Sequence, residues 1–355
     1  MKDFHILVIR PGAIGDVLLA FPVLKALRER YANAHITLVS NGQVLPLALA
    51  CGVAEEVSDY QDMQWGELFS SSGIHSPALA CLLDRTDLAI CWLRDADGIV
   101  ERNLNAAGVK RLVIAPGRPP PGTDMHILDY LAQTIGLPPV GARLWTLHMQ
   151  SGHAHHGTLL ADKSAVGAIN RPLLVCQASC DEQASAGRPQ GSPLHFDCQM
   201  NLDRPIQYVA IHPGSGGARK CWQASHFAGV IERLWQQNRP VLLLEGPAET
   251  ERVRDLLNLV SSPPVPGMLR MLTHAPLLEV AHQLQRCRCY LGNDSGITHL
   301  AAMLGVPTVA IFGPSDPAVW GPVGPSVKVI QERALEDVSV DMVMEAIDSF
   351  YQHRT

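Results

Sequence analysis

Short runs of apolar residues alternate with amphipathic stretches in two parts of the chain. Such runs occupy residues 5–10, 35–39, 87–92 and 111–115, and the alternation starts again at 208–212, 240–244, 289–292 and 307–312. Apolar runs of this length, separated by helix-like stretches, are typical of parallel strands that crossover helices bury on both faces. The pattern therefore predicts two doubly wound α/β domains.

The stretches between the runs predict helices. Residues 16–31 place their apolar side chains on one side of a helix, and the charged side chains of residues 25 and 28–30 on the other. Further helices are predicted near 222–237, 247–260, 276–285 and 295–304. The last segment, LEDVSVDMVMEAIDSFYQH, spaces its apolar residues at helical intervals and is predicted to pack one face against the protein.

The composition changes between the two patterned regions. From His148 to about residue 205 the chain is rich in Ser, Gly, Gln, Pro and His without a clear period, which is typical of a long linker. A chain of 355 residues is also longer than most single hydrophobic cores. We predict an N-terminal domain at 1–147, a partly disordered linker or insertion at 148–205, a C-terminal domain at 206–335 and a final helix at 336–355.

Charge and cysteine content narrow the class of protein. The formal net charge is −6 and no basic block is present, so nucleic acid is not an expected partner. Nine cysteines without a repeating spacing favour a reducing compartment, and the amino-terminal MKDFHILVIR shows no signal-peptide pattern. No apolar run reaches the roughly 18 residues that a membrane span needs. These features predict a cytoplasmic protein.

Residue spacing argues against a metal and against a nicotinamide cofactor. The linker contains soft ligands, but their irregular gaps match no compact zinc motif. The glycine loop RPGAIGD lacks the middle glycine of the dinucleotide fingerprint, and the second predicted strand ends without an acid for a ribose. The linker residues in question are His153, His155, His156, Cys176, Cys180, His195 and Cys198.

The stretch RPGAIGDVLLAFP places an acid where the first strand turns into a helix. Asp16 is interpreted either as the N-cap of that helix or as a carboxylate that accepts a proton from a substrate hydroxyl. Gly12 and Gly15 let a substrate approach the backbone closely, and Arg10 is the basic residue expected at the cleft mouth. The residue types alone leave both interpretations open.

Two later loops predict seats for an anion. In IHPGSGGARKCW, the amide groups of Gly214, Ser215 and Gly216 and the ammonium of Lys220 fit a diphosphate. In LGNDSGITHL, Ser295 and Gly296 lie at the positive end of a predicted helix. Asp294 caps that helix, orients the loop or meets a sugar hydroxyl. His299 faces inward and is interpreted either as a core histidine or as part of the site.

A fourth stretch, PVLLLEGPAETERV, predicts carboxylates at a strand end. Glu245 ends the strand and Glu249 follows Gly246 and Pro247. A carboxylate there can accept hydrogen bonds from both hydroxyls of a ribose. The alternative role of Glu249 and Glu251 is to stabilise the amino terminus of the next helix.

Taken together, RPGAIGDVLLAFP, IHPGSGGARKCW, EGPAETE and GNDSGITHLAAMLGVPTVAIFGPSDP resemble, in this order, the motifs of glycosyltransferase family 9, the ADP-heptose:lipopolysaccharide heptosyltransferase family. The resemblance covers roughly residues 5–140 and 206–330. It implies the GT-B architecture, in which two Rossmann-like domains face a central cleft. The N-terminal domain then binds the acceptor, the C-terminal domain binds the nucleotide-sugar, and the helix at 336–355 packs back toward the N-terminal domain.

The resemblance also implies roles for single residues. Asp16 falls on the general base of the family, and Lys220 falls on its donor-phosphate lysine. Asp294, Ser295 and Gly296 fall on its donor loop. Glu249 falls near its ribose-binding glutamate, with Glu251 as the alternative.

The implied function is metal-independent, inverting transfer of a heptose from ADP-heptose to a hydroxyl of a glycan or glycolipid acceptor like the lipopolysaccharide core. The nucleotide-sugar is a substrate, and no cofactor is implied. Such an acceptor implies peripheral association with the inner face of the cytoplasmic membrane. Two other classes stay open: a GT-B-like nucleotide-sugar epimerase and an inactive nucleotide-sugar-binding protein.

Overall fold

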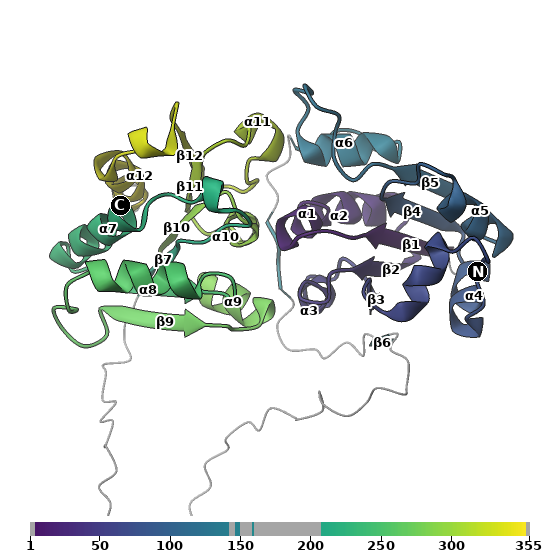
Figure 1. Cartoon of the computed structure of the whole chain (residues 1–355), viewed down its shortest axis with the longest axis horizontal. Helices are drawn as coiled ribbons and strands as arrows, with labels where there is room; N and C mark the ends of the chain where they lie inside the picture. Colours follow the sequence, from purple (N-terminus) through teal and green to yellow (C-terminus); the bar gives the residue numbers. More distant parts are fainter. Residues whose placement is uncertain (1–3, 142–145, 150–157, 160–206, 353–355) are drawn as a thin grey trace, which may run out of the picture. The chain divides into compact units, whose positions relative to one another are not determined.

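The computed structural model describes residues 4–141, 146–149, 158–159 and 207–352 (Figure 1). We call the described residues up to 159 the N-terminal lobe and those from 207 the C-terminal lobe. The elements of both lobes cluster into one compact unit. Residues 160–206, which hold most of the predicted linker and four of its seven candidate metal ligands, lie outside the described residues, and so do His153, His155 and His156.

Six parallel strands form the sheet of the N-terminal lobe, in the order β5-β4-β1-β2-β3-β6 (Figure 1). Side chains of β1 alternate between its two faces, so Ile6 and Val8 join one hydrophobic cluster and Leu7 and Ile9 join another. The strands are β1 (Phe4–Arg10), β2 (Ala34–Ser40), β3 (Glu56–Asp59), β4 (Leu88–Trp92), β5 (Leu112–Ala115) and β6 (Thr158–Leu159).

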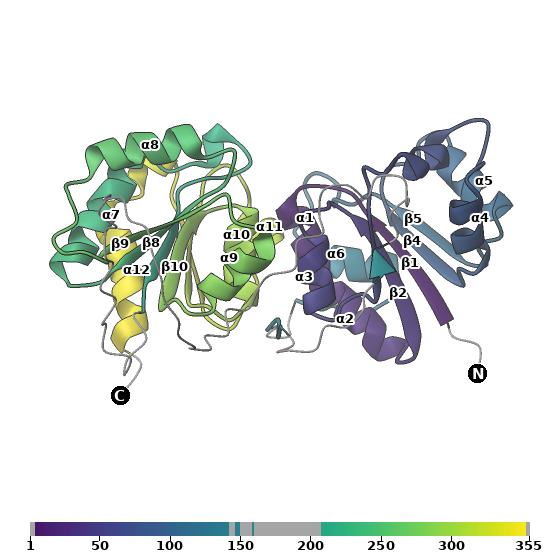
Figure 2. The ribbon, with the colours of Figure 1, turned by 90° about the horizontal axis from the view of Figure 1, so that it is seen from below.

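Helices cover both faces of this sheet (Figure 2). One face carries α1 (Ile14–Leu18), α2 (Phe21–Arg30), α3 (Leu45–Ala50) and α6 (Ile127–Thr134). The other face carries the 3₁₀ segment η1 (Met63–Phe69), α4 (Pro77–Asp84) and α5 (Ile99–Ala106). The single helix predicted at 16–31 is divided into α1 and α2, because Pro22 has no N–H to continue the helical hydrogen bonds.

The C-terminal lobe repeats this plan with a parallel sheet in the order β12-β11-β10-β7-β8-β9. Its strands are β7 (Val209–His212), β8 (Val241–Glu245), β9 (Leu269–Thr273), β10 (Cys289–Asn293), β11 (Thr308–Phe312) and β12 (Val327–Gln331). Its helices are α7 (Ala224–Gln236), α8 (Thr250–Leu259), α9 (Leu277–Leu284), α10 (Gly296–Met303), α11 (Pro317–Trp320) and α12 (Val340–Gln352). Short 3₁₀ turns lie at η3 (Ala218–Lys220) and η4 (Leu335–Asp337).

The final helix does not pack as the family resemblance implied. The expectation that residues 336–355 turn toward the N-terminal domain is wrong, because α12 packs against α7, β11 and β12 of its own lobe. Val343, Met344 and Ile347 are buried in the same cluster as Trp222 and Val209. An ion pair between Arg239 and Asp348 also fixes α12 to the C-terminal lobe.

The sheets include strands that the apolar pattern missed. The predicted linker begins at 148, yet β6 within it pairs with β3 of the N-terminal sheet. The others, β3, β9 and β12, are short strands with few fully buried residues. All but β3 lie at a sheet edge, where a strand needs fewer apolar side chains than a central one does.

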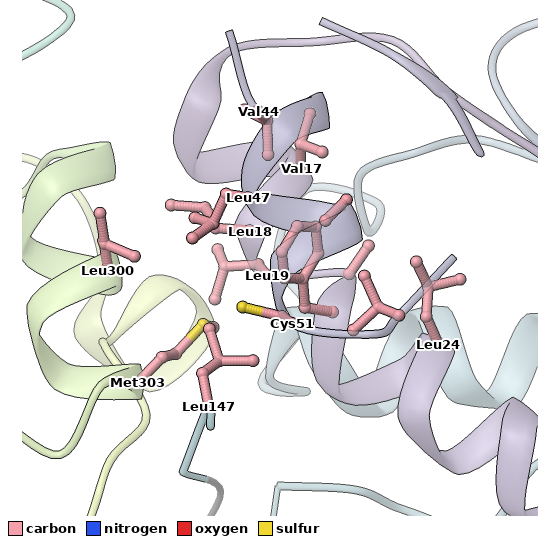
Figure 3. Packing of buried hydrophobic residues seen from close by; sticks show 14 of the residues in the cluster. Val17, Leu18, Leu19, Leu24, Val44, Leu47, Cys51, Leu147, Leu300 and Met303 are labelled. Atoms are coloured by element: carbon pink, nitrogen blue, oxygen red, sulfur yellow. The ribbon is translucent and has the colours of Figure 1, made fainter. Parts of the chain in front are cut away.

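One hydrophobic cluster runs through both lobes where α1 contacts α10 (Figure 3). Leu18, Leu19 and Cys51 of the N-terminal lobe share this cluster with Leu300 and Met303 of α10. In addition, the amide of Leu147 donates a hydrogen bond of 2.6 Å to the carbonyl of Met303. The lobes are therefore joined by a packed apolar contact. Among the described residues, no helix has the length and apolar character to cross a bilayer.

Candidate active site

A cavity of about 1110 Å³ lies between the loops that follow the strands of both sheets. Loops after β1, β2 and β5 line it from the N-terminal lobe, and loops after β7 to β11 line it from the C-terminal lobe. Ligands of open parallel sheets bind at the carboxyl ends of the strands, and this volume suffices for a molecule larger than a drug. The cavity is therefore the candidate active site.

Asp16 lines this cavity from α1. The N-cap of α1 is Ala13, so the interpretation of Asp16 as the N-cap residue is wrong in position. From the third helical position, Asp16 Oδ2 accepts a long hydrogen bond of 3.4 Å from the amide of Ala13. The same oxygen accepts a hydrogen bond of 2.8 Å from Nη2 of Arg118. Oδ1 has no hydrogen-bond donor among the described residues and is free to accept a proton.

Gly12 and Arg10 support Asp16 from outside the cavity. Gly12 has φ +145°, and a Cβ there would lie 3.1 Å from the Asp16 Cβ. Arg10 is only 2% exposed, and its Nε donates a hydrogen bond of 3.3 Å to the backbone carbonyl of Asp16. Burial lowers the pKa of Arg10 from its ordinary value. The expectation that Arg10 lies at the cleft mouth is therefore wrong, and Arg118 takes that place because it follows β5 at the exposed edge of the cavity.

Gly15 lies in a tight contact between the lobes. A Cβ on Gly15 would lie 3.3 Å from His299 Cδ2 and 3.4 Å from the Gly296 Cα. A Cβ on Gly296 would lie 2.9 Å from the Gly15 amide nitrogen and 2.9 Å from Ile14 Cγ2. The two glycines thus allow the amino termini of α1 and α10 to meet at the cavity wall. This is a role for Gly15 beside the predicted one of letting a substrate approach the backbone.

Lys220 and Asp294 form an ion pair in the C-terminal part of the cavity. Lys220 Nζ lies 2.6 Å from Asp294 Oδ2, and the Ser215 hydroxyl donates a hydrogen bond of 2.5 Å to the backbone carbonyl of Asp294. The Lys220 side chain is 39% exposed whereas that of Asp294 is 6% exposed. Of the roles predicted for Asp294, this geometry supports the orientation of the loop, because the carboxylate holds the ammonium at the cavity wall.

The amino terminus of α10 lies beside this ion pair. Ser295 is its N-cap and accepts a hydrogen bond of 3.4 Å from the amide of Thr298. Gly296 and Ile297 both line the cavity, and the amides of a first helical turn have no partner within the helix. Ser215 and Gly216 also line the cavity, and the Ser215 hydroxyl is bonded to the carbonyl of Asp294, directly before this N-cap. Backbone N–H groups in this arrangement can bind an anion.

Glu249 faces the cavity, whereas Glu251 is exposed elsewhere and does not line it. Burial raises the pKa of Glu249. Gly214 does not itself line the cavity, but a Cβ on it would lie 2.1 Å from Glu249 Cγ, so this glycine leaves room for the carboxylate. Glu245 also lines the cavity and accepts a hydrogen bond of 3.3 Å from the hydroxyl of Thr273.

Two buried histidines lie beside these carboxylates. His299 Nε2 is 3.9 Å from Asp294 Oδ1, and burial lowers the pKa of His299 to about 4. His212 Nε2 is 3.9 Å from Glu249 Oε1, and burial lowers the pKa of His212 to about 4 as well. Both rings are therefore neutral near pH 7. His299 fits both interpretations made from the sequence, because it is a buried histidine and also lines the cavity.

Several residues of the cavity wall were given no role by the sequence analysis, among them Arg118, His212 and Trp320. His212 ends β7 inside the quoted motif IHPGSGGARKCW but was given no role there, and Arg118 lies in the loop after β5, outside every quoted motif. Trp320 is the last residue of α11 and lies three residues beyond the end of the last quoted motif. Among the described residues, no group of three or more His, Cys, Asp or Glu side chains could hold a metal ion.

Comparisons with known proteins show which family the chain is similar to. The family model described as glycosyltransferase family 9 (heptosyltransferase) matches residues 173–346. Lipopolysaccharide heptosyltransferase 2 of Salmonella typhimurium is 26% identical over 340 residues, covering 92% of this chain and 87% of that protein. Lipopolysaccharide heptosyltransferase 3 of Escherichia coli is 28% identical over 117 residues, covering 32% of this chain and 34% of that protein.

A solved structure supports the architecture. The structure of E. coli ADP-heptose lps heptosyltransferase II covers 98% of this chain and 99% of its own, with a TM-score of 0.66 and 18% identity. The two parallel-sheet lobes and the cavity that they line have the GT-B architecture. The family model and the curated relatives make the chain similar to glycosyltransferase family 9.

Proposed function

We propose that the chain transfers a heptose from ADP-heptose to a hydroxyl of a lipopolysaccharide-core acceptor, with inversion at the anomeric carbon. The observation that carries the proposal is that one cavity has Asp16 on its N-terminal wall and Lys220 with the α10 amino terminus on its C-terminal wall. The names of the relatives supply the sugar, the nucleotide and the acceptor class.

The C-terminal lobe holds the donor in this proposal. Lys220 and the amides of Ser215, Gly216 and Gly296 bind the diphosphate, since backbone N–H groups and an ammonium match its charge. Glu249 accepts hydrogen bonds from the ribose hydroxyls. Asp294 positions Lys220, and His299, neutral near pH 7, fills the wall behind both.

The N-terminal lobe holds the acceptor, and Asp16 acts as the general base. Oδ1 takes the proton of the acceptor hydroxyl while that oxygen forms a bond to the anomeric carbon. The bond from the anomeric carbon to the diphosphate oxygen breaks, and ADP leaves. Attack from the face opposite the leaving group inverts the configuration, which requires base and diphosphate seat on opposite sides of the sugar.

Charge on the leaving diphosphate is stabilised by protein groups alone in this proposal. The amide dipoles of the α10 amino terminus and the Lys220 ammonium lie in place before the reaction, so they need no reorganisation as negative charge develops. A divalent ion is therefore not required for transfer. Because the proposed acceptor is a glycolipid, the reaction takes place with the enzyme bound peripherally to the inner face of the membrane.

A transfer assay tests the proposal. Purified protein is incubated with ADP-heptose and a lipopolysaccharide-core acceptor with and without EDTA, and the product linkage is determined by NMR. We expect heptosylated product of inverted anomeric configuration, at equal rates in both samples. Loss of activity in EDTA that zinc or magnesium restores would contradict metal independence. Retention of configuration would contradict the single displacement by Asp16.

The choice of nucleotide is tested separately by thermal shift. A ligand at 100 times its dissociation constant stabilises the folded protein by about 2.7 kcal/mol. We expect ADP to raise the melting temperature more than UDP or GDP at equal concentration. A larger shift with UDP or GDP would overturn the assignment of the donor.

A further inference from the structure

Arg118 and Trp320 come from different lobes and meet beside Asp16. Arg118 follows β5, and Trp320 is the last residue of α11. The guanidinium carbon of Arg118 lies 5.9 Å from the centre of the Trp320 ring, and its Nη2 lies 2.8 Å from Asp16 Oδ2. Both side chains line the cavity. The cavity wall next to Asp16 therefore consists of a carboxylate, a guanidinium and an indole.

The backbone around Trp320 is fixed in place. Asp316 caps α11 by accepting a hydrogen bond of 2.8 Å from the amide of Ala318. A Cβ on Gly321 would lie 2.4 Å from the carbonyl oxygen of Pro317, so this tight turn requires glycine. The carbonyl of Gly321 accepts a hydrogen bond of 3.0 Å from Nε2 of His126, which belongs to the N-terminal lobe. A contact between the lobes thus fixes the residue next to Trp320.

We propose that Trp320 and Arg118 form the subsite for the sugar of the acceptor that carries the reacting hydroxyl. The proposal rests on the proposed function of the cavity. The indole packs against the apolar C–H face of a pyranose ring, and the guanidinium donates hydrogen bonds to its hydroxyl oxygens. The ligand class is therefore a ring sugar bound by one face.

The position of Asp16 assigns this wall to the acceptor and not to the donor. A general base must lie within hydrogen-bond reach of the proton that it removes. The sugar with that hydroxyl then lies next to the partners of Asp16, which are Arg118 and, through it, Trp320. The donor-binding groups Lys220 and Glu249 belong instead to loops after β7 and β8.

Arg118 has a second effect as a positioning residue. Its Nη2 donates a hydrogen bond to Oδ2 of Asp16, which leaves Oδ1 to receive the proton. Since Trp320 lies on the C-terminal lobe and Arg118 on the N-terminal lobe, the subsite is complete only when the lobes are in contact. Acceptor binding then depends on both lobes, whereas the donor groups lie on one.

Substitution of Trp320 tests this subsite. Trp320→Leu keeps a large apolar side chain against the surrounding core but removes the flat ring, and Trp320→Phe restores a smaller ring. We expect the Leu variant to raise the KM for the acceptor by about tenfold, a typical effect for one well-packed aromatic contact. The Phe variant recovers most of this loss. The dissociation constant of ADP, measured by calorimetry, stays within about twofold of wild type in both.

Phe69→Ala is the matched control, because Phe69 is an exposed aromatic residue of the N-terminal lobe that does not line the cavity. It should leave the acceptor KM unchanged. An unchanged acceptor KM in Trp320→Leu would overturn the subsite, and so would a loss of ADP affinity as large as the loss of acceptor binding. Absence of any transfer by the wild-type protein would instead count against the proposed function.

Arg118 is tested by its conservative variant. Arg118→Lys retains the positive charge, whereas Arg118→Gln removes it. We expect Arg118→Gln to lower kcat as well as raise the acceptor KM, because Oδ2 of Asp16 loses its charged partner, and Arg118→Lys to recover part of kcat. Equal kcat values for wild type and Arg118→Gln would show that Arg118 does not position Asp16.

Discussion

The contact between Gly15 and Gly296 allows a graded test of lobe alignment. Alanine at 296 places a Cβ 2.9 Å from the Gly15 nitrogen and from Ile14 Cγ2. Non-bonded carbon atoms are normally about 3.5–4.0 Å apart, so α1 and α10 must separate by roughly 0.6–1 Å. Gly15→Ala is milder, since its nearest contacts would be 3.3 and 3.4 Å.

Separating α1 from α10 increases the distance between the proposed base Asp16 and the proposed donor site. In the proposed mechanism Asp16 on α1 accepts the proton and the start of α10 binds the diphosphate, so each helix carries groups that act on a substrate. A misplacement of about 1 Å can reduce a rate by about 100-fold. We expect kcat to fall in the order wild type, Gly15→Ala, Gly296→Ala, with the last about 100-fold below wild type. ADP affinity falls much less, because the groups that bind it remain together on the C-terminal lobe.

Steady-state kinetics and ADP calorimetry on the purified variants give both quantities. Gly66→Ala is the control, because a Cβ there meets no atom within 4 Å and Gly66 lies outside the cavity. It should retain wild-type kinetics. A kcat for Gly296→Ala within about twofold of wild type would refute the reasoning, because a shift of this size between α1 and α10 would then not matter for transfer.

Three further predictions concern charge, pH and packing. Lys220→Met should weaken ADP binding by about 10- to 100-fold by calorimetry, whereas Lys328→Met, outside the cavity, should not. As the pH falls from 6.5 toward the His212 pKa of about 4, the unfolded chain binds a proton at this histidine before the folded protein does. This difference lowers the free energy of unfolding by at most about 3 kcal/mol. Urea unfolding of His212→Gln should therefore show a weaker loss of stability between pH 7 and 4.5, with part of the loss remaining because His299 shifts in the same direction. Ile347→Ala should lower the free energy of unfolding by about 2–5 kcal/mol, and an effect below about 1 kcal/mol would contradict the packing of α12 in the C-terminal lobe.

The central strands could be predicted because their residues are buried on both faces. β1, β4, β10 and β11 are continuous apolar runs, and the predicted bounds agree with the observed ones within a residue or two. The loops of the site could be located for the same reason, because a glycine or polar residue after a buried strand marks the carboxyl end of that strand. The GT-B fold implied by the resemblance is confirmed by a solved structure, and the family model and curated relatives confirm the similarity to glycosyltransferase family 9.

Contacts between distant segments could not be predicted from local patterns. Arg118 is 102 residues from Asp16 in sequence, and no spacing links the two. The buried position of Arg10 depends on how its side chain packs behind α1 and not on its place after an apolar run. The packing partner of α12 depends on which sheet face lacks cover, whereas its apolar stripe shows only that it packs on something. Short strands such as β6 carry too few residues for a period to be visible.

Substitution of Asp16 by asparagine tests the central claim most directly. The variant keeps the shape of the side chain but removes its basicity, and Asp97→Asn, at an exposed position outside the cavity, is the matched control. We expect kcat of Asp16→Asn to fall by about 100- to 10,000-fold while ADP binds as tightly as to wild type and the control stays active. Transfer by Asp16→Asn at a rate close to wild type would contradict the account, because the cavity would then work without its proposed base.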